Sequence, residues 1–579
     1  MAVAFDTLIR GGLVCDGHGG QPYVADVGIT DGKIAAVGFD IGGAANIVDA
    51  EGMLVTPGFI DIHTHYDGQV TWDNCLLPSS LHGVTTVMMG NCGVGFAPCR
   101  PSDRGSLIKL MEGVEDIPGV VMETGVPWNW QSFPEYLDFL DSRNYDVDVA
   151  TQIPHGPTRV FVMGARGADR EPARPDDMRA MAEIVKNGVA AGALGFSTTR
   201  TMIHRSKDGK LAPTVTAAEN ELTTIAKALG EIGRGTLQLV DDFHGLDDDN
   251  IGDFDMLKRL ARASERPLLV TVAQRPDAPE RYRTLMHLID QANDEGLNIK
   301  AQVAARPIGL LFSLSHSAHP FHMCPTYLEI AHLPLDERVG IMRKPEVRAK
   351  ILSEDSTEPS PEWKAQTRAV DDMYELGDVP NYEPKPEDRL GSRAKALGIS
   401  PLELAYDILL KNNGTSIIFY PAGNFAWRTL DPVLEMMKSR NCVLGVGDGG
   451  AHLGMICDAS LPTFTLIHWT RDRDGERLTI GDAIKRWTSG PANAIGLLDR
   501  GLIAPGYRAD INIIDYDKLE LTSPHMVHDL PSGGGRLMQE ANGIVATFKN
   551  GIETYRDGKS TGAMPGRLIR GSQPAPIAA

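Results

Sequence analysis

The sequence predicts an α/β protein, a distorted (β/α)8 TIM barrel with a small β-sandwich domain formed from both termini. Strand-length apolar runs alternate with amphipathic stretches through the middle of the chain, which is typical of a (β/α)8 barrel. Short strands separated by Gly and Asp-Gly turns occupy both ends. The 579 residues are enough for a barrel and a second, smaller domain.

The two ends of the chain predict the two parts of the sandwich. Apolar and polar positions alternate between turns within the first 57 residues, and the same pattern returns after residue 501. We therefore expect residues 1–57 and 501–579 to pair into one β-sandwich.

Residues 58–500 predict the barrel. They hold nine candidate strands, one more than a (β/α)8 barrel needs, so we expect one of them to be an addition. Residues 310–400 are charged and rich in proline without a strong period, which predicts an insertion on the catalytic face. The candidate strands lie at 58–65, 85–93, 148–156, 192–199, 235–243, 267–274, 299–307, 416–423 and 442–450.

Composition excludes several classes of protein. The formal charge of −20, from 56 basic and 76 acidic residues, disfavours nucleic-acid partners and anionic membranes. We find no apolar run of 18 residues and no secretory signal at the start, so we expect a cytoplasmic protein with no membrane partner. An odd number of cysteines, seven, predicts reduced thiols. The sequence leaves a homo-oligomer open.

His63 and His65 follow the apolar run that begins at Val55. Residues two apart in a strand point to the same side, so the two imidazoles are expected to face together. Active sites of barrels lie where the strands end, and the change from apolar to polar residues marks that rim. The pair therefore predicts two imidazole ligands of a metal site. The alternative is two hydrogen-bonded histidines at the end of a strand.

Two further residues are expected to reach the same corner of the rim. Asp448 ends the last apolar run of the barrel region, and barrel closure places strand eight beside strand one. Cys92 ends the run that follows strand one. A turn-forming aspartate and a buried structural thiol are the alternatives. Nitrogen, oxygen and sulfur ligands together favour zinc over cobalt, nickel or iron.

Several segments resemble the amidohydrolase superfamily, and within it the N-acyl-D-amino-acid deacylases (D-aminoacylases). They are "TPGFIDIHTHYD", "VTTVMMGNCGVGFAP", "GALGFST", "GVGDGGAH" and "GLIAPGYRADINIID", and the likeness covers most of the chain. The resemblance implies a distorted (β/α)8 barrel flanked by a β-sandwich, zinc, and amide hydrolysis. It also implies that His63, His65 and Cys92 hold metal and that Asp448 is the catalytic aspartate and a ligand.

The sequence departs from the family at strands five and six, where family members have histidine ligands. Val240 and Val272 fall at about those places, and valine cannot ligate a metal. A shift of register would bring Asp241, Asp242, His244 or Gln274 into use instead. We therefore expect one tightly held zinc, with a second metal left open.

Further residues are candidates for contact with substrate. His155, at the end of strand three, is expected to polarise the scissile carbonyl, with a loop hydrogen bond as the alternative. Arg200 and His204 follow strand four on the catalytic side, where a cation binds a carboxylate or stabilises an oxyanion. His244 and Gln274 complete the predicted substrate-binding set.

These residues predict a metal-dependent amidohydrolase with a small-molecule amide substrate, an N-acyl amino acid or a related N-acyl amide. Bound zinc lowers the pKa of its water to about 7, so that hydroxide forms at neutral pH. Asp448 would take the proton of that water and pass it to the leaving nitrogen. The alternatives are a cyclic amide hydrolase or a deaminase on the same site, and a non-catalytic binding or scaffold protein of this fold.

Overall fold

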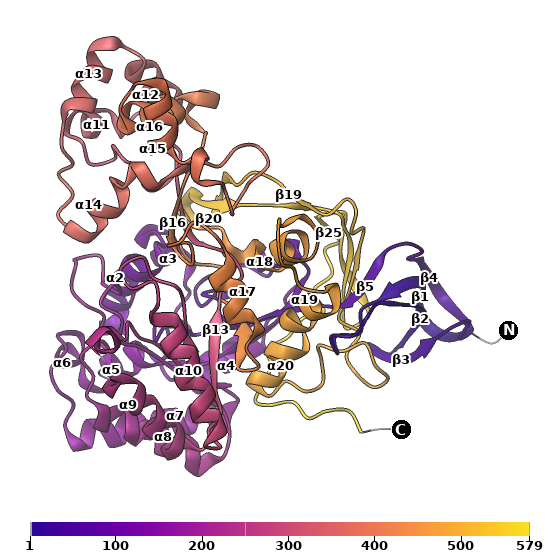
Figure 1. The fold of residues 1–579 in the computed structure, drawn as a ribbon. Coiled ribbons are helices and arrows are strands. Elements are labelled where there is room, and N and C mark those ends of the chain that lie inside the picture. The colour runs from indigo at the N-terminus through magenta and orange to yellow at the C-terminus, as the bar shows by residue number, and fades with distance from the viewer. Residues whose placement is uncertain (1–2, 249–250, 578–579) are drawn as a thin grey trace.

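The computed structural model describes residues 3–248 and 251–577 and has an α/β architecture (Figure 1). Its parallel strands form two ladders in the orders β6-β7-β8 and β9-β10-β11-β12-β13-β17. One residue separates β8 from β9, so the chain passes directly from the first ladder into the second. The strands are β6 (Phe59–Asp61), β7 (Val84–Met89), β8 (Asp148–Thr151), β9 (Ile153–Pro154), β10 (Gly195–Thr199), β11 (Thr236–Val240), β12 (Leu268–Thr271), β13 (Ile299–Val303) and β17 (Cys442–Leu444).

The parallel strands are buried because helices cover them. In α8 (Glu219–Ile232), Leu222, Ile225, Ala226 and Leu229 are buried at the spacing of one helix face. Every residue of β7 and β8 is buried, which explains their continuous rather than alternating apolar pattern. The other covering helices include α7 (Pro175–Ala191), α9 (Gly252–Ser264), α10 (Arg281–Asp294), α17 (Asp431–Lys438), α19 (Ile480–Trp487) and α20 (Ser489–Ile495).

The segments that follow β6, β7 and β17 are joined by backbone hydrogen bonds. Asp448 N donates to His63 O at 3.1 Å, and His65 N donates to Gly449 O at 2.8 Å. On the other side, Thr64 N donates to Met88 O at 3.0 Å. The ends of the first, second and last parallel strands therefore lie side by side.

Both ends of the chain contribute to one nine-stranded sheet, in which β5 pairs with β18 (Figure 1). The pairing is antiparallel and brings Val55 opposite Ile513. A separate core lies against this sheet and includes Ile9, Val27 and Phe548. The strands are β1 (Val3–Val14), β2 (Tyr23–Thr30), β3 (Lys33–Gly38), β4 (Gly43–Asp49), β5 (Leu54–Pro57), β18 (Ile511–Ile514), β23 (Ile544–Lys549), β24 (Ile552–Arg556) and β25 (Lys559–Ser560).

A buried cluster of charged residues joins this sheet to the parallel strands. Asp148, in β8, accepts hydrogen bonds from Arg500 Nη1 at 2.7 Å, and its Oδ2 lies 2.8 Å from Lys549 Nζ. Lys549, in β23, also pairs with Asp510 at 2.8 Å, and Arg500 pairs with Asp499 at 2.9 Å. The side chains of Asp148, Arg500, Lys549 and Asp510 are at most 3% exposed. Each buried charge thus has an opposite charge as partner, as burial requires.

A helical segment is inserted between β13 and β17, and Figure 1 shows it as a lobe apart from the parallel strands. Its antiparallel sheet has the order β14-β16-β15. Residues 416–423, one of the nine predicted strands, include β16, which identifies the additional strand. The elements are β14 (Ile308–Phe312), α11 (Pro325–Ile330), α12 (Leu335–Met342), α13 (Pro345–Ser353), α14 (Pro361–Thr367), β15 (Tyr374–Glu375), α15 (Leu390–Leu397), α16 (Pro401–Leu409) and β16 (Ile418–Gly423).

The insertion has its own hydrophobic core, to which Phe312, Met342 and Tyr406 belong. It touches the loop that follows Asp448, since Leu311 N donates to Met455 O at 2.8 Å. Of the helices in the described part of the chain, none has the length and apolar character needed to cross a bilayer.

Candidate metal centre

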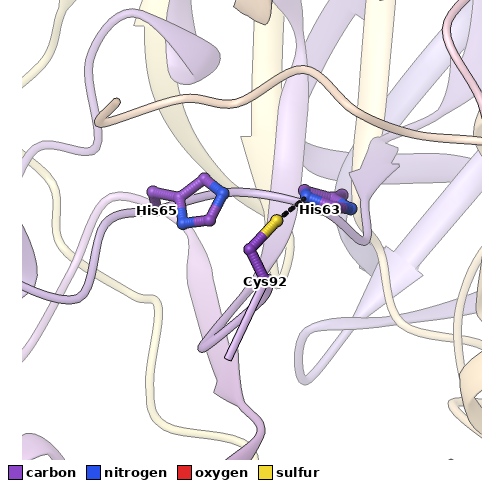
Figure 2. Close-up of side chains that lie close together, drawn as sticks. All are labelled: His63, His65 and Cys92. Atoms are coloured by element: carbon purple, nitrogen blue, oxygen red, sulfur yellow. Dashed lines mark hydrogen bonds between the residues drawn. The ribbon is translucent and has the colours of Figure 1, made fainter. Parts of the chain in front are cut away.

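Four side chains from the ends of three neighbouring strands converge on one point. His63, His65 and Cys92 each offer a ligand atom, and these three atoms lie within 4.8 Å of one another (Figure 2). Cys92 Sγ is 3.3 Å from His63 Nε2. Asp448 Oδ1 is 3.6 Å from His63 Nε2 and 3.7 Å from His65 Nε2. The structure therefore brings together the four residues that the sequence predicts as ligands.

The histidines reach this point by a slightly different route from the one predicted. The strand β6 ends at Asp61, so His63 and His65 lie beyond it. After a bend at Ile62, His63 and His65 bond the segment after β17 while Thr64 bonds β7 on the other side. Successive residues thus continue to bond to alternate sides beyond the last residue of β6, and the rings of His63 and His65 lie 5.5 Å apart.

Two of the ligand candidates have left-handed backbone conformations, which are unfavourable for residues other than glycine. The φ angle is +55° at Cys92 and +47° at Asp448. Hydrogen bonds hold both: Cys92 N donates to Gln238 Oε1 at 3.1 Å, and Asp448 N donates to His63 O at 3.1 Å. The surrounding structure therefore fixes the direction in which the thiol and the carboxylate point.

In the absence of a cation, the surroundings of the cluster favour the neutral forms of its groups. Burial, reinforced by Glu115 and Asp448, raises the pKa of the Cys92 thiol well above its ordinary value. Burial, with Asp458 and Asp61 nearby, likewise raises the pKa of Asp448 well above its usual range. Burial lowers the pKa of His63 to about 4, although its bond to Gln302 opposes this shift. A bound cation reverses the balance for the acids, since it favours thiolate and carboxylate.

The geometry and the donor set both fit zinc. Zinc bonds of 2.0–2.3 Å in a tetrahedron place neighbouring ligand atoms roughly 3.3–3.8 Å apart. Three of the six separations among the four groups, 3.3, 3.6 and 3.7 Å, fall in this range. The group whose ligand atoms all lie within 4.8 Å of one another consists of His63, His65 and Cys92, so Asp448 lies at its edge. Asp448 Oδ1 is buried and has no hydrogen-bond partner among the described residues. Because no hydrogen bond occupies this oxygen, its lone pairs are available to a metal ion.

Glu115, His452 and His204 surround the four groups. Glu115, the last residue of α2 (Arg104–Glu115), places Oε1 3.4 Å from His65 Nδ1 and Oε2 3.6 Å from His452 Nε2. The pKa of His65 is lowered well below its ordinary value by burial and then by His63, His452 and His204. His204, a predicted substrate-binding residue, therefore lies beside the cluster.

Two glutamines also contact the cluster, and sequence reasoning missed both. The Oε1 atom of Gln302, in β13, lies 2.9 Å from His63 Nδ1. The Oε1 atom of Gln238, in β11, accepts a hydrogen bond from Cys92 N. The Nε2 atoms of both are buried without a hydrogen-bond partner among the described residues. Both glutamines are fully buried, but β11 also contains Thr236 and β13 contains Lys300, so no polar interruption of an apolar strand marked them in the sequence.

The positions at strands five and six are apolar, as the sequence indicated. Val240, at the end of β11, packs against the core, and Val272, after β12, is 1% exposed. The expected alternatives by register shift have other partners. Asp241 pairs with Arg200 at 3.0 Å, and Asp242 pairs with Arg275 at 2.6 Å. The described residues thus supply no replacement histidine from these two strands to the cluster.

His155 does not have the environment predicted for a residue that polarises a carbonyl. Its Nδ1 lies 2.9 Å from Thr198 Oγ1, and its Nε2 lies 2.8 Å from Glu221 Oε1. Arg159 also pairs with Glu221, at 2.8 Å. Both ring nitrogens are therefore occupied inside a buried network, and neither is free for a substrate. The hydrogen-bonded alternative describes this histidine.

Three of the predicted substrate-binding residues have structural partners. Arg200 donates to Asp241 and to Ala217 O, and His244 is 54% exposed beside Asp242. Gln274 Oε1 accepts from Ala426 N at 2.9 Å, so this buried side chain holds the loop after β16. Gln274 is therefore a structural residue here, while substrate contact by Arg200 and His244 stays a prediction.

Comparisons with known proteins bear on the family and the fold of this chain. A family model described as "Amidohydrolase family" matches residues 46–561. The N-acyl-D-aspartate deacylase of Alcaligenes xylosoxydans xylosoxydans is 25% identical over 572 residues, covering 97% of this chain and 95% of that protein. A solved structure of D-aminoacylase, described for its binuclear metal center, has 21% identity and a TM-score of 0.64 and covers 98% of this chain and 100% of its own. The N-acyl-D-glutamate deacylase from Bordetella bronchiseptica, complexed with zinc and a phosphonate inhibitor, has 22% identity and a TM-score of 0.64, with 98% and 99% covered.

Proposed function

We propose, because this chain belongs to the amidohydrolase family and to its D-aminoacylase-like branch, that it cleaves the amide bond of an N-acyl amino acid or a related N-acyl amide. It is a hydrolase of carbon–nitrogen bonds other than peptide bonds. The observation that carries the proposal is the convergence of two imidazoles and a thiol, whose ligand atoms lie within 4.8 Å of one another, with a carboxylate oxygen 3.6 and 3.7 Å from the two imidazoles.

His63, His65, Cys92 and Asp448 are the residues that would hold the metal, and zinc is the ion we propose. When bound, zinc would make a water acidic at neutral pH and polarise the amide carbonyl. The relative crystallised with zinc is consistent with this choice.

Asp448 is the residue we assign to proton transfer. Its Oδ1 is buried without a hydrogen-bond partner among the described residues and faces both histidines. As a carboxylate it would take a proton from the attacking water and give it to the leaving nitrogen when the carbon–nitrogen bond breaks. An amine anion is a very poor leaving group, so the second transfer matters as much as the first.

We propose one tightly held metal per chain. The D-aminoacylase structure is described for a binuclear centre with "one-metal activation and second-metal attenuation". Here Val240 and Val272 stand at the proposed strand-five and strand-six positions, and the neighbouring carboxylates are committed to arginines. One complete set of N, S and O donors supports a single site.

The finer description of the fold is also a proposal. We propose that the parallel strands close into a distorted (β/α)8 barrel and that the shared terminal sheet belongs to a β-sandwich. The strand order and the bonds from His63 and His65 to the segment after β17 support closure. The proposed boundaries are residues 1–57, 58–500 with the insertion, and 501–579.

A metal count coupled to a substrate panel tests this function. Purified protein is loaded with zinc, passed over a desalting column and measured by plasma mass spectrometry, then assayed with N-acyl D- and L-amino acids and simple aryl amides. We expect about one equivalent of zinc and hydrolysis of at least one N-acyl compound. Two equivalents would contradict the single site, and turnover of cyclic amides or amino-purines alone would contradict the substrate class.

Replacing Cys92 by serine is expected to remove zinc. Loss of a thiolate ligand should weaken zinc binding by more than the roughly 10–100-fold that follows from removing a residue that only hydrogen-bonds a ligand. Zinc affinity is measured by competition with a chromogenic chelator. Cys75→Ser is the matched control, because Cys75 is a half-buried free thiol outside the cluster. Unchanged affinity in Cys92→Ser would exclude the thiolate from the metal site.

A further inference from the structure

Glu115 lies between two histidines of the site, although nothing in the sequence singled it out. Its two carboxylate oxygens face different rings: Oε1 is 3.4 Å from His65 Nδ1, and Oε2 is 3.6 Å from His452 Nε2. The backbone is tied as well, since His452 N donates to Glu115 O. One residue thus contacts both the segment after β6 and the loop after β17.

The position of Glu115 is costly without such partners. The side chain is 2% exposed, and burying a carboxylate is expensive unless it is paired or hydrogen-bonded. It is also the last residue of α2, where the negative end of the helix dipole disfavours another negative charge. The ring nitrogens of two imidazoles, 3.4 and 3.6 Å away, are the partners that the structure gives to the oxygens of this side chain.

His65 has a ring nitrogen that needs a partner. Its Nε2 faces Asp448 Oδ1 at 3.7 Å, on the side of the proposed metal. Its Nδ1 is buried, and no described residue is aligned to hydrogen-bond it, although Glu115 Oε1 is within ion-pair distance. A neutral imidazole carries one N–H, so a proton on Nδ1 leaves the lone pair of Nε2 for a metal. His63 shows the same arrangement, with Gln302 Oε1 at its Nδ1.

We propose that Glu115 is a positioning residue of the metal centre. With one oxygen it accepts the Nδ1–H of His65 and so orients that ring for ligation through Nε2, and with the other it holds the ring of His452. Metal-ligating histidines commonly donate their second N–H to a carboxylate, which fixes both the tautomer and the ring. The inference rests on the proposed metal-dependent function, but it concerns the affinity of the site for metal rather than the substrate.

Glu115→Ala, Glu115→Gln and the control Glu112→Gln test the role. Glu112 lies on the same helix, one turn earlier, and pairs at the surface with Lys207. The zinc dissociation constant is measured with a competing chelator, and the Co²⁺-substituted protein is examined by visible absorption. We expect zinc binding to weaken roughly 10–100-fold in Glu115→Ala, with a changed Co²⁺ spectrum. We expect less weakening in Glu115→Gln, whose carbonyl still accepts from His65, and none in Glu112→Gln.

Two outcomes would overturn the proposal. One is zinc affinity in both Glu115 variants within twofold of the parent protein. The other is equal weakening in Glu112→Gln, which would indicate a general effect of altering α2. Should Glu115→Ala fail to fold, the isosteric Glu115→Gln still decides between these results. Neither readout needs turnover, so a protein that hydrolyses no N-acyl compound but loses zinc affinity on these changes would refute the proposed substrate and keep the role of Glu115.

Discussion

Replacing Asp448 by asparagine is expected to lower kcat by roughly 10²–10⁴-fold, the usual contribution of a general acid or base, while the protein keeps its metal. Asparagine retains an oxygen of similar position for the metal but has no carboxylate to accept the proton of water. The measurement is steady-state hydrolysis of the best N-acyl compound, together with zinc content after desalting.

Asp378→Asn is the control for this prediction, because Asp378 is exposed in the insertion and undergoes the same replacement of one carboxylate oxygen by an amide nitrogen. It should leave both kcat and zinc content unchanged. Normal activity in Asp448→Asn would remove Asp448 from the chemistry. Loss of zinc together with activity would assign Asp448 to ligation without evidence for proton transfer.

Replacing Asp148 by asparagine is expected to lower the free energy of unfolding by roughly 3–5 kcal/mol, the cost of breaking a buried ion pair by removing one partner. The change leaves Arg500 and Lys549 buried with less opposite charge. We expect the lower end of that range, since Asp499 and Asp510 remain as their second partners. Urea unfolding followed by tryptophan fluorescence measures the difference.

The matched control is Asp141→Asn, whose carboxylate is 49% exposed and pairs with Arg570 at the surface. Exposed pairs contribute about 0–1 kcal/mol, so this variant should unfold nearly as the parent does. Equal stability of Asp148→Asn and the parent would contradict a stabilising role of these ion pairs.

The contribution of Asp148 to the free energy of unfolding should also disappear in acid. Burial alone would raise the pKa of this carboxyl, but the Lys549 ammonium and the Arg500 guanidinium outweigh burial and hold the pKa well below its ordinary value of 3.8. Stability from a depressed pKa is fully present above the unfolded value and is lost as the pH falls through the folded value. The difference in unfolding free energy between the parent and Asp148→Asn should therefore be constant near pH 7 and shrink below about pH 4. A constant difference down to pH 3 would contradict the ion-pair origin.

The four convergent side chains could be predicted because strand order alone brings them together. Neighbouring parallel strands place their ends at one rim, and His63, His65, Cys92 and Asp448 each follow an apolar run. Val240 and Val272 were identified by another route, the resemblance to the D-aminoacylases, which have histidine ligands at strands five and six. Period and order of the strands alone would not have marked these two positions.

Glu115 and His452 could not be predicted in this way, because their positions depend on loop and helix-end geometry. Glu115 closes a helix whose length is not marked in the sequence, and the next residue, Asp116, has a left-handed backbone with φ of +51°. His155 failed as a prediction for a related reason: its partner Glu221 lies 66 residues away on α8, and no local pattern announces the pair.

The helices of the insertion were missed because they are short. The helices α11 to α16 have six to nine residues each, about two turns, which gives too few positions for an amphipathic period to stand out. Their stability comes from the shared core around Phe312, Met342 and Tyr406.

Because β5 pairs with β18, synthesis of the polypeptide leaves one edge of the first strands open until more than 450 further residues have left the ribosome. Until then the hydrogen-bonding groups of β5 on that side are available to other nascent chains. Premature termination anywhere before residue 511 would make this exposure permanent, so shortened products of this chain should be found with chaperones or in inclusion bodies rather than free in the lysate.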